Sequence, residues 1–356
     1  MKPADSRVAD ALYPEPHAQS HDRLNVLDGW RAVSILLVLV GHWLPIDRLL
    51  PGLNESAAAT GMAIFFTLSG FLITRFLLQR PEPAAFLIRR FLRILPLAWS
   101  AMLLLYLCDA AAPGATERLA ANWLFFANLP PARLFPTGGG HLWSLCVEMQ
   151  FYVGVALIVA LAGRRGLLAL PLLALAVTAA RIVAGQTISI VTWHRLDEIL
   201  AGATLALIHA GRLGPAVRSA LARCNLAAVA AVAIPACYFL HAPIAYARPW
   251  AVAALVGVTL FHAPAWLAKA LASRPAAYIA DISYALYVFH GMLGATWLGS
   301  GEGLARLAKR PLLIAATFLA AHLSTTRFEA HFIRLAKQLT ARPRPTPAAP
   351  LEVLGR

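Results

Sequence analysis

Long apolar stretches, separated by short segments rich in Arg, Pro and Gly, recur from residue 31 to residue 330. A helix of about 20 predominantly apolar residues is long enough to cross the hydrocarbon core of a bilayer. The pattern therefore predicts an all-α, polytopic membrane protein with about ten transmembrane helices in one bundle. The predicted spans are 31–49, 60–79, 95–111, 144–162, 166–184, 193–210, 222–240, 248–263, 277–297 and 311–330.

Composition agrees with this class and excludes two others. Of the 356 residues, 59% are hydrophobic and only 13% are charged, which is too apolar for an ordinary soluble domain. The net charge of +14 would suit a nucleic-acid-binding protein, but the basic residues are spread over the loops between apolar stretches. Because no basic domain with interleaved aromatic residues is present, we expect no nucleic-acid partner.

The distribution of Lys and Arg predicts the orientation. With the N-terminus in the cytoplasm, twenty Lys and Arg fall in the inner segments and nine in the outer loops. Inner loops of membrane proteins carry the excess of basic residues, so both termini are predicted to be cytoplasmic. The first 28 residues are polar, so no cleaved signal peptide is expected. The predicted divisions are a cytoplasmic N-terminal segment 1–30, a membrane domain 31–331 and a disordered cytoplasmic tail 332–356.

Two ionisable residues stand on the first apolar stretch, Arg31 and His42, with only uncharged residues between them. Eleven residues make about three helical turns, so both side chains point the same way, about 16 Å apart along the axis. Arg31 is thus expected at the inner surface and His42 near the middle of the bilayer. Ionisable side chains at that depth mark a functional site, although a histidine hydrogen-bonded within the bundle is an open alternative.

A second group of charges is Arg89-Arg90-Phe91-Leu92-Arg93, at the inner end of the third span. Arg90 and Arg93 are three residues apart and share a helical face. Guanidinium groups hold phosphate through paired hydrogen bonds, so the pair is a candidate clamp for coenzyme A or a nucleotide. A topology signal or a contact with lipid headgroups explains the same charges.

A third group opens the fourth span from the outer side. His141, Ser144, Glu148 and Tyr152 recur at a spacing of three to four residues and so form one stripe. A glutamate about one turn inside the membrane requires a partner. A carboxylate beside the His42 imidazole would raise its basicity and select its tautomer. An interfacial glutamate whose side chain reaches up to water is the alternative interpretation.

Other polar residues admit structural explanations. Ser283, Tyr287 and His290 in the ninth span can share a face and join helices by hydrogen bonds, and Ser69-Gly70 is a small-residue patch for close helix approach. The segment 193–198 contains four ionisable residues, His194, Arg195, Asp197 and Glu198, which suits either an acceptor-binding site or a salt-bridge cluster. No metal-binding spacing occurs, so no metal is expected and the four cysteines are interpreted as packing residues.

Taken together and in this order, five segments of the chain resemble acyltransferase family 3, the bacterial integral-membrane O-acyltransferases. The matching segments are Leu27-Asp28-Gly29-Trp30-Arg31 with His42, Phe65-Phe66-Thr67-Leu68-Ser69-Gly70-Phe71-Leu72-Ile73, Arg89-Arg90-Phe91-Leu92-Arg93-Ile94-Leu95-Pro96, His141-Leu142-Trp143-Ser144-Leu145-Cys146-Val147-Glu148-Met149-Gln150-Phe151-Tyr152, and Ser283-Tyr284-Ala285-Leu286-Tyr287-Val288-Phe289-His290. Each is weak alone, but five in register over residues 27–290 are specific. One departure is Glu329-Ala330-His331, where family members often have Glu-x-Pro after the last span.

The resemblance implies transfer of an acyl group, often acetyl, from cytoplasmic acyl-coenzyme A to a hydroxyl of an extracytoplasmic or lipid-linked carbohydrate. It implies a multi-pass protein of the bacterial cytoplasmic (inner) membrane, surrounded by membrane lipids. Acyl-coenzyme A is then a co-substrate, and no permanently bound cofactor is expected. The implied residues are His42 and Glu148 for catalysis, Arg31, Arg90 and Arg93 for acyl-coenzyme A, and Asp28, His141, Ser144, Tyr287 and His290 as supporting polar groups.

In the predicted reaction, His42 deprotonates the acceptor hydroxyl as a general base, or accepts the acyl group itself and passes it outward. Glu148 is the candidate carboxylate that orients His42. A transporter or flippase for a polar or lipid-linked sugar is the alternative function, since it also explains buried polar residues. The unbroken first span and the absence of an internal repeat fit a transporter poorly. A scaffold or sensor would need none of the aligned polar stripes.

Overall fold

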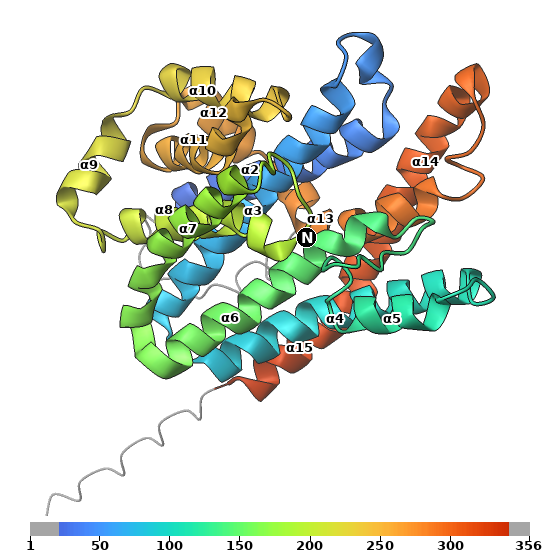
Figure 1. Ribbon diagram of the computed structural model, residues 1–356, viewed down its shortest axis with the longest axis horizontal. Helices are drawn as coiled ribbons and strands as arrows, with labels where there is room; N and C mark the ends of the chain where they lie inside the picture. The colour runs from blue at the N-terminus through green and yellow to red at the C-terminus, as the bar shows by residue number, and fades with distance from the viewer. Residues whose placement is uncertain (1–20, 342–356) are drawn as a thin grey trace, which may run out of the picture.

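The computed structural model describes residues 21–341, which fold into helices joined by short loops and contain no strand (Figure 1). The all-α prediction is therefore confirmed for this part of the chain. The α-helices are α2 (His21–Trp43), α3 (Leu53–Gln79), α4 (Pro83–Cys108), α5 (Ala115–Trp123), α6 (Trp143–Gly166), α7 (Leu170–Val183), α8 (Asp197–His209), α9 (Pro215–Arg223), α10 (Leu226–Tyr238), α11 (Arg248–His262), α12 (Ala265–Leu271), α13 (Arg274–Gly294), α14 (Gly303–Leu323) and α15 (Ala330–Leu339).

Each of the ten predicted apolar spans coincides with a helix, but the helices differ in their capacity to cross a bilayer. Within the described residues, five helical segments are long and apolar enough for this, and a sixth is added if α9 and α10, bent by 85° at their junction, form one span. Helix α8 has 13 residues and is therefore about 20 Å long, shorter than the hydrocarbon core. Ten crossings and the location of the termini remain predictions.

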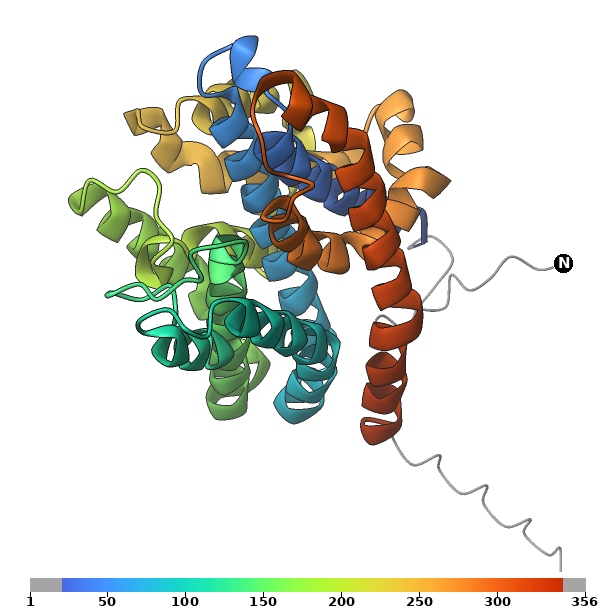
Figure 2. The same cartoon turned by 90° about the vertical axis from the view of Figure 1, so that its right-hand side faces the viewer.

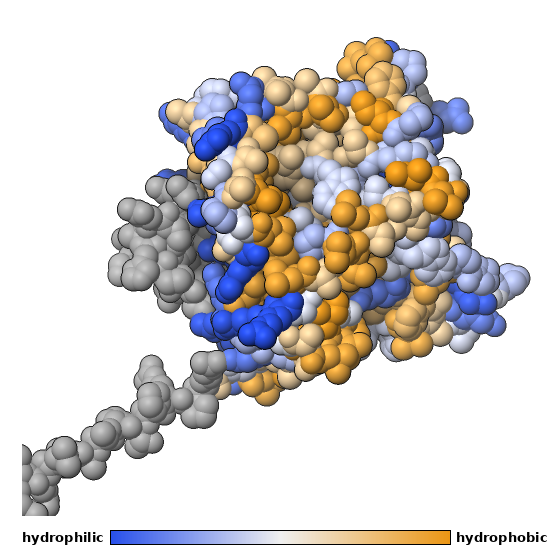
Figure 3. All heavy atoms as spheres, turned by 60° about the vertical axis from the view of Figure 1, so that its left-hand side comes forward, coloured by the Kyte–Doolittle hydropathy of each residue, from blue (hydrophilic) through white to orange (hydrophobic). Residues whose placement is uncertain are grey.

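The surface supports a membrane protein. Figure 3 shows apolar side chains over a broad part of one face, with hydrophilic side chains gathered along its margin. Large apolar residues of α6 and α7 are openly exposed, including Leu161 at 79% and Val183 at 89% relative exposure of the residue. Soluble monomers rarely expose contiguous apolar patches of this kind, whereas lipid tails cover them without cost.

The first helix differs from the predicted span 31–49. Helix α2 runs from His21 to Trp43, so it begins about ten residues earlier and ends six residues earlier than expected. Gly29 does not interrupt it, because its missing side chain allows the backbone of Leu271 to approach closely. Pro45 ends it, because proline disfavours helical geometry at the preceding residue. His42 is an exposed residue of the last turn and does not lie in the middle of the helix as the span 31–49 predicted, while its depth in a bilayer stays a prediction.

Helix α3 runs through the centre of the fold between α2 and α8 (Figure 1). Close contact with α8 requires glycine on both sides. A Cβ on Gly70 would lie 1.8 Å from the Ile199 carbonyl oxygen, and a Cβ on Gly202 would lie 2.0 Å from the Thr67 carbonyl oxygen. The prediction that Gly70 belongs to a patch for close helix approach is therefore confirmed.

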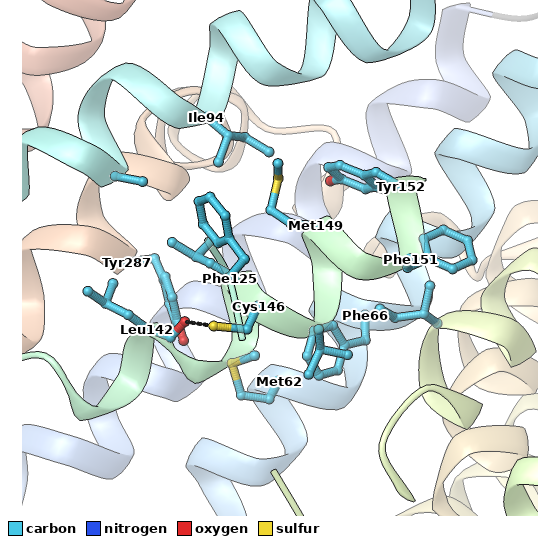
Figure 4. Close-up of a cluster of buried hydrophobic side chains, with 14 of the residues drawn as sticks. Met62, Phe66, Ile94, Phe125, Leu142, Cys146, Met149, Phe151, Tyr152 and Tyr287 are labelled. Carbon is cyan, nitrogen blue, oxygen red and sulfur yellow. Dashed lines mark hydrogen bonds between the residues drawn. The ribbon is translucent and has the colours of Figure 1, made fainter. Parts of the chain in front are cut away.

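Helix α6 contributes the centre of the apolar core. Figure 4 shows Cys146 between Met62, Phe125 and Tyr287, with its thiol directed at the carbonyl of Leu142, 3.9 Å away. All four cysteines are free thiols; Cys146 and Cys237 are buried, as packing residues should be, whereas Cys224 is partly exposed and Cys108 is exposed, contrary to that prediction. The opposite face of α6 supports the polar stripe described below.

The predicted disordered tail 332–356 is wrong over its first part. After α14, the chain continues through a π-helix, Ser324–Glu329, into α15, and the three make one long rod (Figure 2). Helix α15 packs against α4, burying Ile333 and Ala336. Beside its end, Arg89 Nε donates a hydrogen bond of 2.6 Å to Thr340. Residues 342–356 lie outside the described part.

Candidate active site

A narrow cavity of about 80 Å³ lies among α2, α3, α4, α6 and α13. We call it the Glu148 cavity. It brings together Arg31, Arg90 and Arg93, the residues predicted to bind acyl-coenzyme A, although they come from two helices far apart in the sequence. All three arginines are partly buried. The remaining polar lining is contributed by Ser34, Ser69, Glu148, Tyr152, Ser283, Tyr284 and Tyr287.

Glu148 is 4% exposed and is held by two hydroxyl groups. Its Oε1 accepts hydrogen bonds from Ser69 and Tyr152. The guanidinium of Arg90 lies over the Tyr152 ring, 5.6 Å from its centroid. A buried carboxylate is costly unless it is hydrogen-bonded and its charge is balanced, and here the hydroxyls and the neighbouring arginines meet both needs.

Ser69 is a site residue that the sequence interpretation missed. Its neighbour Gly70 explains the close helix crossing, so Ser69 was assigned to packing alone. Tyr152 was placed on the correct stripe but without a role. The signal that could have found both is the buried glutamate, because a carboxylate at that depth needs donors from a facing helix.

Asp28 lies one turn before Arg31 on α2, and its Oδ1 is 3.5 Å from Arg31 Nη1. Both side chains remain partly exposed, at 32% and 23%. An ion pair of this spacing and exposure contributes little to stability, but it limits the directions that the guanidinium can take. Asp28 therefore lies where it can orient Arg31, and its supporting role in the reaction stays a prediction.

Three histidines from distant parts of the chain meet near the end of α2. His42 comes from α2, His141 from the short helix η2 (Gly140–Leu142) and His290 from α13. The ring centroid of His290 is 5.0 Å from that of His42 and 4.4 Å from that of His141. We call these three residues the histidine layer. In the described part of the chain, no group of three His, Cys, Asp or Glu side chains is arranged to hold a metal ion.

Backbone carbonyls select the tautomers of the layer. His42 Nδ1 lies 2.8 Å from the Val38 carbonyl oxygen, and His290 Nδ1 lies 2.6 Å from that of Tyr287. A carbonyl only accepts, so in the neutral ring each Nδ1 carries the proton and each Nε2 keeps its lone pair. The buried Nε2 of His290 has no hydrogen-bond partner among the described residues. The layer therefore presents basic nitrogens rather than N–H groups.

Tyr287 and Ser144 attach the layer to α6. The Ser144 and Tyr287 hydroxyl oxygens are 2.6 Å apart, and the Tyr287 hydroxyl donates to the His141 carbonyl. His141 Nε2 in turn donates to the Val288 carbonyl, 3.2 Å away. A Cβ on Gly291 would lie 2.3 Å from His141 Nδ1, so only glycine leaves room for the ring. The predicted supporting residues Ser144, Tyr287 and His290 thus belong to one assembly around His141.

The predicted partnership between Glu148 and His42 is wrong. The stripe of His141, Ser144, Glu148 and Tyr152 exists, but Glu148 is seven residues further along than His141, about 10 Å along the helix. His42 lies beside His290, whereas Glu148 faces Ser69 and Tyr152. The cause is the register of α2, which places His42 at the helix end instead of its middle.

A second cavity, of about 520 Å³, is lined by His42. We call it the His42 cavity. It lies between the end of α2 with the following loop and the beginning of α14. Tyr287 lines the Glu148 cavity and contacts both His141 and His290, with ring centroids 5.2 and 5.4 Å away. The layer therefore opens to one cavity through His42 and adjoins the other through Tyr287.

Two further features answer questions left by the sequence. The segment 193–198 forms a buried salt-bridge cluster, in which Arg195 and Arg248 pair with Glu198 at 3.1 and 2.9 Å and Arg181 pairs with Asp197. Glu329 is buried at the end of the π-helix and accepts hydrogen bonds from Ser324 and Thr325. Without the family's proline two positions later, the helix continues into α15.

Comparison with known proteins adds an independent line of observation. In a match that covers 84% of this chain, it is 28% identical to peptidoglycan O-acetyltransferase OatA of Listeria monocytogenes. Over 38% of the chain it is 26% identical to Nodulation protein 10 of Rhizobium leguminosarum bv. viciae. The chain spans 54% and 44% of these relatives' lengths, respectively. No solved structure matches it.

The acyltransferase domain that defines acyltransferase family 3 matches residues 24–325, which include both cavities and the histidine layer. The match begins within α2 and extends past residue 290, where the last of the five resembling segments ends. This confirms the predicted family and, at the level of the family, the prediction of an acyltransferase rather than a transporter. The chain belongs to acyltransferase family 3.

Proposed function

We propose that this protein is a membrane O-acyltransferase that moves an acyl group, in the simplest case acetyl, from acyl-coenzyme A to a carbohydrate hydroxyl. The observation that carries the proposal is a layer of three histidines that lines one cavity through His42 and adjoins the other, arginine-containing cavity through Tyr287. Family membership and a relative named for peptidoglycan O-acetylation support the reaction class. Donor and acceptor then approach the layer from opposite sides, the donor from the cytoplasm.

The Glu148 cavity suits the donor. Phosphate groups of coenzyme A would bind the guanidiniums of Arg31, Arg90 and Arg93 at its rim. At about 80 Å³ the cavity is far below the 300–1,000 Å³ of typical ligand pockets, so it can admit only a thin chain such as the pantetheine arm with its thioester. Glu148 keeps Arg90 and Tyr152 in place and does not touch the reacting atoms.

The chemistry is assigned to His42. Its Nε2 takes the proton from the acceptor hydroxyl while the hydroxyl oxygen bonds to the thioester carbonyl carbon. The carbon–sulfur bond then breaks, and the coenzyme A thiolate takes the proton back from the imidazolium. The same nitrogen would carry the acyl group in a two-step transfer, because both routes need the lone pair on Nε2.

The test is acetyl transfer in membrane vesicles that contain the full chain, supplied with acetyl-coenzyme A labelled in the acetyl group. We expect label in extracted glycan or glycolipid, at a level that depends on the protein and on acetyl-coenzyme A. Vesicles without the protein are the control. Mass spectrometry of surface glycans from cells with and without the protein identifies the acceptor. Equal labelling in both vesicle preparations would reject the proposed function, and a transporter would move sugar without any dependence on acetyl-coenzyme A.

A further inference from the structure

The His42 cavity carries an unusual concentration of positive charge at its rim. Arg48 comes from the loop after α2, and Arg306 and Arg310 come from the first turns of α14. His42 lines the same cavity. Glu302 is the one acidic residue in the lining, against three arginines. The orientation predicted from Lys and Arg places all three in outer loops, where basic residues are scarce.

These three guanidiniums have no anionic partner within residues 21–341. No carboxylate lies within ion-pair distance of any of them, and no side-chain hydrogen bond joins them to a neighbour. Arg310 is nevertheless only 7% exposed, and the like charge of Arg306 acts on it. The contrast with Arg181 and Arg248 is direct, because those buried arginines are each paired with an acid.

Grouped arginines without counter-ions repel one another, and a bound oxyanion relieves that repulsion. The planar guanidinium fork fits carboxylate and phosphate with paired hydrogen bonds. The volume of about 520 Å³ lies in the range of pockets that hold small molecules, unlike that of the Glu148 cavity. The exposed positions of Arg48 and Arg306 leave the rim accessible to a solute.

We propose that the His42 cavity binds an acceptor carrying an anionic group, a carboxylate or phosphate on the sugar or its carrier. Arg306 and Arg310 hold the anion, Arg48 faces them across the cavity, and the hydroxyl to be acylated is placed at His42. This inference rests on the proposed function and names its substrate class. A lipid phosphate offers the same chemistry to the arginines, so the test must separate it from an anion on the acceptor.

The experiment uses the purified full chain in phosphatidylcholine nanodiscs, with acetyl-coenzyme A as donor. Acceptors are offered in matched pairs that differ in charge: p-nitrophenyl glucuronide against its amide, and glucose 1-phosphate against methyl glucoside. We expect transfer to the anionic member to be about tenfold or more faster, with a difference that shrinks as salt is added. In the Arg48→Gln/Arg306→Gln variant, KM for the anionic acceptor should rise until the preference is lost, while KM for acetyl-coenzyme A is unchanged.

Because Arg48 and Arg306 are exposed, the Arg48→Gln/Arg306→Gln variant leaves the buried packing intact. A second variant, Arg310→Gln, removes the charge of the buried third arginine and tests the same loss of preference. Lys309→Gln is the matched control, because it removes a positive charge from the same helix, where the amine bonds the Trp297 carbonyl outside the cavity lining. Its acceptor preference should stay within twofold of wild type.

Two outcomes would overturn the inference. In the first, charged and neutral acceptors are acylated at equal rates and the arginine variant affects both alike. This would show that the acceptor is not recognised through an anionic group. A defect of the variant that follows the content of phosphatidylglycerol in the nanodiscs, and not the acceptor charge, would assign the arginines to lipid. The absence of any acetyl-coenzyme A consumption with every acceptor would instead count against the proposed function itself.

Discussion

The two cavities near the histidine layer differ in volume and in whether their arginines have acidic partners. The Glu148 cavity holds about 80 Å³, and its buried glutamate offsets the arginines around it. The His42 cavity holds about 520 Å³, and its three arginines have no acidic partner in the described part of the chain. One cavity is narrow and has a buried carboxylate and the Arg31–Asp28 pair beside its arginines, whereas the other is wide and its arginines form no ion pair within residues 21–341.

The difference indicates how the two sides divide recognition. A narrow cavity suits a donor whose reacting arm has a constant shape, because a single geometry can be held by packed helices. A wide cavity with unpaired charges suits an acceptor recognised by its charge more than by its outline. His42 lines the wide cavity, and Tyr287 of the narrow cavity contacts His141 and His290, so substitutions in the two cavities should affect different steps of one reaction.

The largest effect is expected at the layer itself. His42→Ala removes the only lone pair that lines the His42 cavity from the layer, and general acid–base catalysis typically contributes about 10²–10⁴-fold. We expect acetyl transfer to fall by at least about 100-fold. Binding of coenzyme A, measured by calorimetry on the purified protein, should be unchanged. If a normally expressed variant transfers acetyl groups at the wild-type rate, His42 takes no part in the chemistry. The division into a donor side and an acceptor side would then be rejected.

The donor side should respond in binding. Changing both Arg90 and Arg93 to Gln removes two charge-assisted contacts to phosphate, each worth about 1.5–3 kcal/mol. The affinity for coenzyme A should therefore fall by about 100-fold or more, with the acceptor KM unaltered. Titration with coenzyme A and with dephospho-coenzyme A measures the loss. Unchanged affinity for both ligands would reject the assignment of the Glu148 cavity to the donor.

The geometry of the layer can be disturbed without removing a functional group. A Cβ at Gly291 would displace the His141 ring, and shifts of about 1 Å in a catalytic arrangement can cost up to about 100-fold in rate. Gly291→Ala should therefore lower transfer by about tenfold or more while coenzyme A still binds.

The matched control for Gly291→Ala is Gly154→Ala on α6, where no atom lies within 4 Å of the added carbon. It should keep full activity and gain up to about 1 kcal/mol of stability from higher helix propensity. Equal activity of the two alanine variants would show that the His141 ring has room to move and that its position is not critical.

The smallest effect is expected inside the Glu148 cavity. Tyr152→Phe removes one of the two hydroxyls that bond Glu148 and leaves the donation from Ser69. The free energy of unfolding should fall by about 1 kcal/mol, which a thermal melt in detergent detects. The KM for acetyl-coenzyme A should rise a few-fold, because Arg90 loses its neighbouring dipole, while acceptor KM is unchanged. An effect on acceptor KM alone would show that the two cavities are not separate in function.

Local patterns in the sequence were sufficient for much of this picture. Apolar runs predicted a helix at each of ten places, and the helix at every one of them is present. Spacings of three and four residues correctly placed Ser144, Glu148 and Tyr152 on one face of α6. Five segments in register were enough to predict the family. These properties depend on residues close together in the chain, which is why periodicity reveals them.

Helix ends were harder to predict, because weak signals compete there. The apolar run begins at Arg31, yet α2 begins ten residues earlier and passes through Gly29 without a break. The helix also ends at Trp43, six residues before the predicted end of the span, which puts His42 in the last turn instead of the middle and separates it from Glu148. The true contacts of Glu148 required knowledge of which face of α3 lies opposite α6.

The sequence by itself determined the helical class, the family and the chemical types at the site. Only the tertiary structure decided that His42, His141 and His290 meet, that Ser69 and Tyr152 hold Glu148, and that three arginines gather without acidic partners at one rim. The physical reason is that helix periodicity is a local property. Which faces meet depends on side-chain packing between segments far apart in the sequence, and no local pattern encodes it.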